Sequence, residues 1–188
     1  MGGGVALFIK DCIGFKINGA YNLITAEAVF VDILGYNKKT VIGAVYRPPG
    51  GMLSKFNLKF TELLDNISAL NNECVLAGVY NIDLLKQTNT ETAAFTELLQ
   101  SYSTTPMITI PTRCSDDKMS LIDNIFYNNY KGTGTSGVIL SDLSDHFPVF
   151  FIIGNSIKRQ RTKTVYKLIR KIDDIKIKEI AEKLSELV

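Results

Sequence analysis

The segment Ser144–Val149, which reads SDHFPV, holds the residue with the clearest capacity for chemistry. His146 is the single histidine of the chain, and a histidine exchanges protons near neutral pH and binds metals. An isolated histidine is more often structural or solvated. Here it follows Asp145 at the junction of a loop and an apolar strand, where folds commonly carry catalytic groups. The segment therefore predicts a chemical role for His146.

A second carboxylate lies inside an apolar stretch. Asp123 belongs to Ser120–Phe126, which reads SLIDNIF, and its neighbours predict a buried strand. A carboxylate in such a place needs a partner, because burial of an unpaired charge is costly. A structural pair is one interpretation. The other is an acid that orients His146 and fixes its tautomer, as in other catalytic pairs.

Two further strand ends carry polar groups. Tyr46 ends an apolar strand and is followed by Arg47 and two prolines, and Asn81 follows the apolar run CVLAG at positions 74–78. A tyrosine at a sheet edge and an asparagine in a turn are the ordinary interpretations of these residues.

Taken together and in this order, these segments resemble the endonuclease/exonuclease/phosphatase superfamily. The resemblance is closest to the endonuclease domain of non-LTR retrotransposons of the jockey and CR1 type, and it runs from about Gly2 to Phe151. The matching segments read GGGVALFI, YRPP, VLAGVYNIDLL, SLIDNIF and SDHFPVFF. The resemblance implies an α/β fold, a four-layer αββα sandwich of the deoxyribonuclease I-like type.

The resemblance also implies a role for each site residue. His146 would contact the scissile phosphate with support from Asp123, and Asp145 would belong to the magnesium site or its near shell. Tyr46 would hydrogen-bond the phosphate, Asn81 would position it beside the nucleophile, and Arg47 and Ser120 would contact substrate. The implied cofactor is Mg²⁺ or Mn²⁺, and the implied reaction is in-line attack of metal-assisted water on a DNA phosphodiester. The implied partners are DNA and a downstream reverse transcriptase in the parent polyprotein.

Departures from the family pattern lead us to expect little or no activity. The acid of the family's GDFN motif falls at Val79, which can neither accept a proton nor hold a water. The loss of general-base assistance would cost about 10²–10⁴ in rate, and we do not expect Asp83 to compensate. The family's magnesium-binding glutamate belongs to an early ETW-like segment, whereas Glu27 stands in a later strand. We therefore expect a truncated, degenerate copy that lacks its first strands.

Two alternatives stay open. One is a catalytically dead remnant that binds nucleic acid or protein, through the basic stretch at 158–171. A solvated linker is the more ordinary interpretation of that stretch. The other alternative is a branch of the superfamily that acts on lipid or inositol phosphates, although the YRPP and SLIDNIF segments favour the retroelement branch.

The elements that position these residues follow from hydrophobic periodicity. Leu53–Leu70 and Thr90–Tyr102 predict amphipathic helices, the second with Asn89 as its cap. A turn is expected at 47–51, and a hairpin-type connection at 35–39. The predicted strands are Val5–Lys10, Glu27–Leu34, Thr40–Tyr46, Cys74–Gly78, Met107–Ile110, Leu121–Tyr127, Gly137–Leu140 and Pro148–Ile153.

Composition limits the remaining possibilities. The chain has 188 residues, of which 46% are hydrophobic, enough for one domain with a core. Residues 1–157, the expected partial domain, carry 11 Lys/Arg against 14 Asp/Glu, and residues 158–188, the expected basic linker and C-terminal helix, carry 10 against 5. Three irregularly spaced cysteines predict free thiols in a reducing compartment. The chain shows no secretory signal and no apolar run near the ~20 residues of a membrane span. We expect an intracellular protein, nuclear if functional, with no membrane partner.

Overall fold

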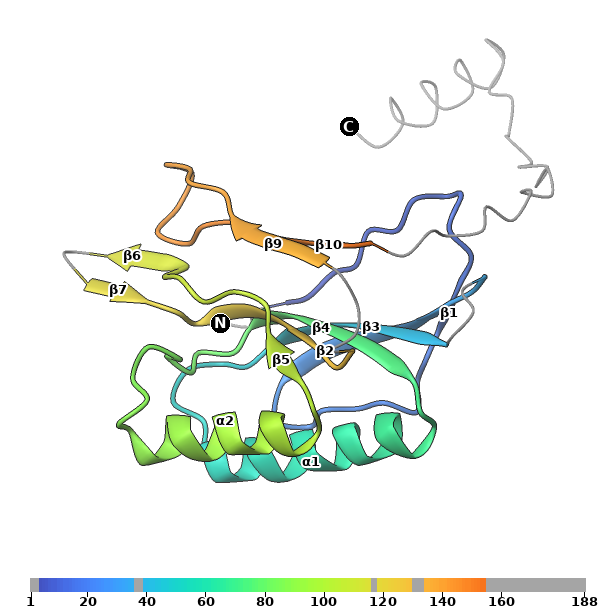
Figure 1. Cartoon of the computed structure of the whole chain (residues 1–188), viewed down its shortest axis with the longest axis horizontal. Coiled ribbons are helices and arrows are strands. Elements are labelled where there is room, and N and C mark those ends of the chain that lie inside the picture. The colour runs from blue at the N-terminus through green and yellow to red at the C-terminus, as the bar shows by residue number, and fades with distance from the viewer. Residues whose placement is uncertain (1–3, 36–38, 116–117, 130–133, 155–188) are drawn as a thin grey trace, which may run out of the picture.

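A six-stranded sheet forms the centre of the computed structural model, which describes residues 4–35, 39–115, 118–129 and 134–154 (Figure 1). The strand order in this sheet is β1-β2-β3-β4-β8-β5. Strands β3 and β4 are parallel, and the other neighbouring pairs are antiparallel. The bounds are β1 (Phe15–Ile17), β2 (Glu27–Ile33), β3 (Thr40–Tyr46), β4 (Glu73–Val79), β5 (Thr105–Pro106) and β8 (Asp123–Tyr127).

Two helices cover one face of this sheet (Figure 1). Helix α1 (Leu53–Ala69) connects the parallel strands β3 and β4, a connection that cannot be made by a tight turn. Helix α2 (Thr90–Ser101) begins at Asn89, whose side chain accepts hydrogen bonds from the amides of Glu91 and Thr92. The predicted cap is therefore confirmed, and such a cap contributes about 1 kcal/mol.

The main core lies between these helices and the sheet. Buried residues of α1 follow one another at three- and four-residue spacing, which places them on one side of the helix. They are Leu53, Phe56, Phe60, Leu63, Leu64 and Ile67. The rings of Phe56 and Phe60 contact those of Tyr80 and Phe95. The Phe126 ring contacts Tyr80 and Phe95 from the sheet. Burial of each such ring contributes about 1.5–3 kcal/mol.

A second, smaller core lies on the opposite face of the sheet. The antiparallel pair β9 (Gly134–Val138) and β10 (Val149–Ile153) packs there, with Phe151 edge-on against Tyr127 at a centroid distance of 5.1 Å. A separate hairpin consists of β6 (Arg113–Ser115) and β7 (Lys118–Ser120). The α/β fold class is confirmed, and the described residues supply three of the four expected layers: the helices, the large sheet and β9–β10.

Several predicted elements require correction. Val5–Lys10 is not a strand: it alternates half-buried and exposed residues, but no ladder forms with any described strand. Met107–Ile110 also lies outside any strand, because only Thr105 and Pro106 pair with β8 before the chain turns toward β6. The sequence patterns did not predict strands β1, β5, β6 and β7, and β9 covers Gly134–Val138, whereas a strand over Gly137–Leu140 was predicted. The centre of the 35–39 connection, the basic stretch and the C-terminal helix lie outside the described residues.

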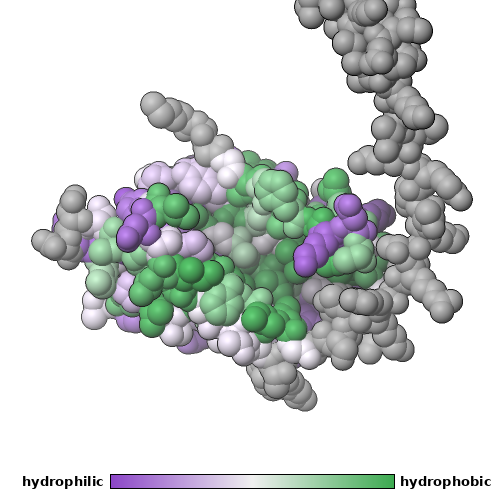
Figure 2. All heavy atoms as spheres, turned by 90° about the horizontal axis from the view of Figure 1, so that it is seen from above, coloured by the Kyte–Doolittle hydropathy of each residue, from purple (hydrophilic) through white to green (hydrophobic). Residues whose placement is uncertain are grey.

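The face that carries β9 and β10 exposes hydrophobic groups. Seen from this side, hydrophobic residues form several areas among polar ones (Figure 2). Leu140 and Leu143, in the loop between the two strands, are 79% and 90% exposed.

No helix in the described ranges is long and apolar enough to cross a membrane.

Gly78 provides a test of the sheet. A Cβ atom at this position would stand 1.8 Å from the carbonyl oxygen of Val45 in the paired strand β3. We predict that Gly78→Ala lowers the free energy of unfolding by about 3 kcal/mol or more, because a backbone atom of the ladder would have to move. Urea denaturation measures the change. Gly19→Ala is the control: no atom lies within 4 Å of its Cβ position, so we expect a change within about 0.5 kcal/mol. Equal losses would contradict the prediction.

Candidate active site

One cross-strand row brings two of the predicted site residues to the same end of the sheet. In the register of the sheet, Tyr46 of β3 pairs with Val79 of β4, and Val79 pairs with Asp123 of β8. Residues paired across neighbouring strands face the same side. In this row that side is the one opposite the helices, where Ile125, two residues from Asp123, contributes to the second core. Val79 therefore separates the tyrosine from the carboxylate.

Asp123 is the buried carboxylate of this row, with 7% of the residue exposed. Both of its carboxylate oxygens lie 3.0 Å from Nδ1 of His146. Its Oδ2 also accepts a hydrogen bond of 2.7 Å from the hydroxyl of Thr112. The two residues lie as expected for an acid that orients a histidine, since a carboxylate at Nδ1 holds the proton there and leaves Nε2 for another group. Their catalytic role stays a prediction.

Thr112 is a central residue of the site that sequence reasoning missed. It is fully buried. Its hydroxyl donates to Asp123 and accepts from the backbone amides of Ile122 and Asp123, at 3.3 and 3.1 Å. Nothing in the sequence around Thr112 distinguishes it from the other threonines. Its importance arises from the pairing of its segment with the residues that precede β8.

The loop that carries His146 is fixed to the β6 segment by backbone hydrogen bonds. The amide of Cys114 donates to the carbonyl of Asp145 at 2.9 Å, and the amide of Phe147 donates to the carbonyl of Thr112 at 2.7 Å. Within the loop, the Ser144 hydroxyl donates to the carbonyl of His146 and accepts from its amide. His146 is thus held through both its ring and its backbone.

Asp145, the predicted metal ligand, is occupied by a different partner. Its Oδ2 accepts a hydrogen bond of 2.7 Å from Nε of Arg113. This hydrogen bond is the main reason that the pKa of Asp145 lies below its usual range. The described residues contain no group of three or more His, Cys, Asp or Glu side chains that could hold a metal, and the Arg113 guanidinium is the observed partner of the carboxylate that was expected to bind Mg²⁺.

Ser120 and Asp83 lie at a surface cleft of about 750 Å³ beside this loop, together with Arg113 and Lys118. The Asp83 carboxylate accepts from the backbone amides of Leu121 and Leu85, at 3.0 and 3.2 Å, and its other oxygen lies 3.3 Å from Nζ of Lys86. These contacts give Asp83 a structural function. Whether Asp83 can replace an acid at Val79 stays a prediction.

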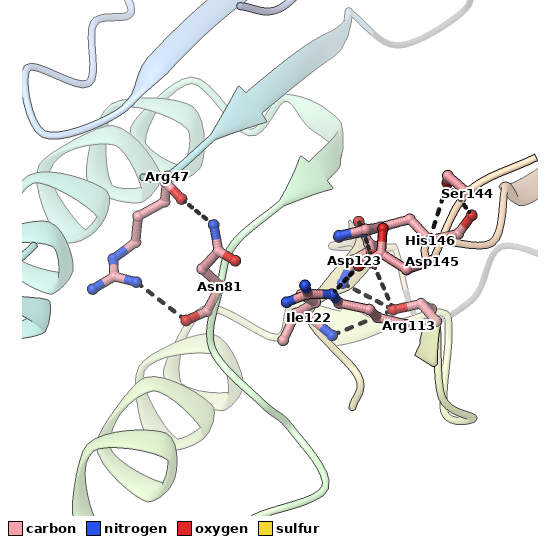
Figure 3. A network of polar contacts seen from close by, with 9 residues as sticks. Arg47, Asn81, Arg113, Ile122, Asp123, Ser144, Asp145 and His146 are labelled. Carbon is pink, nitrogen blue, oxygen red and sulfur yellow. Dashed lines mark hydrogen bonds and ion pairs between the residues drawn. The ribbon is translucent and has the colours of Figure 1, made fainter. Parts of the chain in front are cut away.

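Arg47 and Asn81 connect the ends of β3 and β4 on the other side of Val79 (Figure 3). The Arg47 guanidinium donates to the carbonyls of Gly51, Tyr80 and Asn81, at 2.6, 3.2 and 3.3 Å. In return, Nδ2 of Asn81 donates to the carbonyl of Arg47 at 2.7 Å. Arg47 is only 6% exposed, and its guanidinium donates to backbone carbonyls. From the sequence, a contact with substrate was predicted for this residue.

Solved structures confirm the predicted fold. The endonuclease domain of TRAS1, a telomere-specific non-LTR retrotransposon, matches with a TM-score of 0.61 and 13% identity over 75% of this chain and 67% of that domain. An endonuclease/exonuclease/phosphatase family protein from Leptotrichia buccalis matches with a TM-score of 0.50 and 20% identity over 69% of this chain and 53% of that protein. The 3′ phosphatase NExo from Neisseria, solved with a product DNA hairpin, matches with a TM-score of 0.52 and 18% identity over 77% of this chain and 70% of that protein.

These structural matches establish a common fold, and their sequence identities of 13%, 20% and 18% are too low to establish anything finer. No protein-family model matches the sequence, and no curated protein sequence matches it. The chain has the deoxyribonuclease I-like fold of endonuclease/exonuclease/phosphatase proteins, and it spans about two thirds of the first of these structures and about half of the second.

Thr112 permits a direct test of the site's internal support. We predict that Thr112→Val lowers the free energy of unfolding by about 2 kcal/mol or more, because it deprives a buried carboxylate oxygen and two amides of a hydrogen-bond partner. Urea denaturation measures the loss.

Thr61→Val is the matched control. Thr61 is a half-buried residue of helix α1, and its hydroxyl donates to the carbonyl of Asn57 in the same helix. We expect its replacement to change the free energy of unfolding by no more than about 0.5 kcal/mol. A Thr112→Val variant as stable as this control would show that the hydroxyl does not support the site.

Proposed function

We propose that this chain is the endonuclease domain of a non-LTR retrotransposon, a phosphodiesterase that acts on DNA, with a cleavage step that is weak or absent. The Asp123–His146 pair carries the proposal, because it presents an oriented imidazole at the end of the sheet. The similarity to the TRAS1 endonuclease domain supports the retroelement assignment. The DNA-bound structure of NExo supports DNA as the substrate class. Such a domain would act in the nucleus, beside a reverse transcriptase of the same polyprotein.

The residues of the chain would act on a phosphodiester as follows. Asp123 accepts the hydrogen bond from Nδ1–H of His146 and so orients the ring, which in its imidazolium form would donate from Nε2 to a phosphate oxygen. Such a donor is most effective when it is already in place before charge develops. The hydrogen bond from Thr112 to Asp123 and the two bonds between the Ser144 hydroxyl and the His146 backbone supply this rigidity. Tyr46 and Asn81 lie at the same end of the sheet, where we propose that they contact the same phosphate.

Two features explain a weak cleavage step. Val79 occupies the position between Tyr46 and Asp123, where the family pattern has an acid, and an isopropyl group cannot take a proton from water. The loss of that assistance reduces the rate by about 10²–10⁴. The family is metal-dependent, but Asp145 is paired with Arg113 and the described residues offer no three-ligand group.

A second candidate function is a catalytically dead domain that retains DNA binding. The pairing of Asp145, the expected metal ligand, with Arg113 favours it. The basic stretch at 158–171 is the proposed contact, and phosphate contacts of this kind weaken steeply as salt rises. Action on lipid or inositol phosphates is a third candidate function, and a comparison of activity on DNA with activity on these phosphates would separate it from the first two.

Nicking of a supercoiled plasmid in Mg²⁺ or Mn²⁺ tests the first proposal. We predict that the unaltered chain nicks close to the rate of a protein-free sample. Val79→Asp should raise nicking about tenfold, short of the full 10²–10⁴ of a general base, and His146→Ala in that background should abolish the gain. Lys59→Met is the control, because the Lys59–Glu62 pair lies on the surface of α1.

The outcomes separate the candidates. Salt-sensitive DNA binding without any gain from Val79→Asp would assign the chain to the catalytically dead class. A chain that neither binds nor nicks DNA would contradict both. Strong nicking by the unaltered chain would overturn the weak cleavage step.

A further inference from the structure

Asn81 occupies an uncommon backbone conformation at the end of β4. Its φ is 51°, in the left-handed region that few residues other than glycine adopt, and asparagine is among those that tolerate it. Tyr80, directly before it, is buried in the aromatic core, and its amide donates to the carbonyl of Ile122 at 2.9 Å. The chain therefore turns sharply between a residue held in the core and one at the site. Such conformations persist only when their surroundings hold them in place.

The Arg47 guanidinium is the group that holds this turn. It donates to the carbonyls of Tyr80 and Asn81, on both sides of the turn, and to the carbonyl of Gly51. The backbone amide of Arg47 also donates to the carbonyl of Val79 at 2.9 Å. The guanidinium carbon lies 5.6 Å from the centre of the Phe56 ring, which keeps the group beside the core. A planar group with five donors is suited to such a set of carbonyls, and a lysine ammonium is not.

The same contacts determine how the Asn81 side chain is turned. The Arg47 carbonyl can only accept a hydrogen bond, so the Asn81 atom 2.7 Å from it must be the amide nitrogen. The amide oxygen Oδ1 then faces away from Arg47. Figure 3 shows Asn81 with its side-chain oxygen directed away from Arg47.

We propose that Arg47 is a positioning residue. Its guanidinium holds the backbone of Tyr80 and Asn81, and this fixes the Asn81 amide with Nδ2 on Arg47 and Oδ1 directed away from it at the end of the sheet. The catalytic importance of this arrangement rests on the proposed function, whereas the arrangement itself does not. Arg47 acts through Asn81 and makes no contact with substrate.

Nuclear magnetic resonance of the Asn81 side-chain amide tests the arrangement without any activity. The two Nδ2 protons are assigned by their loss in Asn81→Asp. In the unaltered chain we expect one slowly exchanging proton and a scalar coupling across the hydrogen bond to the Arg47 carbonyl. In Arg47→Lys we expect exchange at least tenfold faster, with loss of that coupling. In Lys59→Met, which alters an exposed pair on α1, we expect no change.

A folded Arg47→Lys variant with an unchanged Asn81 amide would overturn the proposal. If Arg47→Lys does not fold, the absence of the coupling in the unaltered chain would overturn it equally. In the Val79→Asp background, Arg47→Lys should remove most of the roughly tenfold gain in nicking rate and leave the Kd for DNA, measured separately by binding, within twofold. If no variant nicks DNA while the amide responds as expected, the proposed function fails and the positioning inference stands.

Discussion

A buried carboxylate at one end of the sheet is the constraint on which this site depends. A carboxylate at 7% exposure needs hydrogen-bond partners for its oxygens, because burial of an unpaired polar group is costly. The Thr112 hydroxyl and the His146 ring occupy them, and these two residues come from segments before β6 and before β10. The carboxylate thus connects three parts of the chain at one point. The backbone hydrogen bonds from the amides of Cys114 and Phe147 join the same two segments, the one at β6 and the loop before β10.

The opposite side of the site depends on the helical core. Tyr80 meets Phe126 at a centroid distance of 4.6 Å and contacts Phe56 as well, so the end of β4 cannot shift without disturbing the core. Phe56 also supports the guanidinium of Arg47. A chain of packed groups therefore runs from α1 to Asn81. Two rigid supports, one polar and one aromatic, hold the two sides of the sheet end where Tyr46 and Val79 lie.

Sequence patterns predicted what depends on local order in the chain. The helix α1 and strands β2, β3 and β4 follow from periodicity, and Asn89 follows from the chemistry of caps. Val5–Lys10 has the composition of a strand, but a strand also needs a partner, and composition does not reveal partners. Thr112 and Arg113 were missed for the same reason, since their roles arise from contacts with Asp123 and Asp145. Arg47 was noticed through the YRPP turn, but only the structure shows that its donors face carbonyls.

The most direct test of the account is a double-mutant cycle between Asp123 and His146. The stabilities of the unaltered chain, Asp123→Ala, His146→Ala and the double variant are measured by urea denaturation at pH 7. If the buried carboxylate holds the histidine loop to the sheet, the coupling free energy between the two positions should be about 1 kcal/mol or more. A coupling near zero, with losses that simply add, would contradict the account.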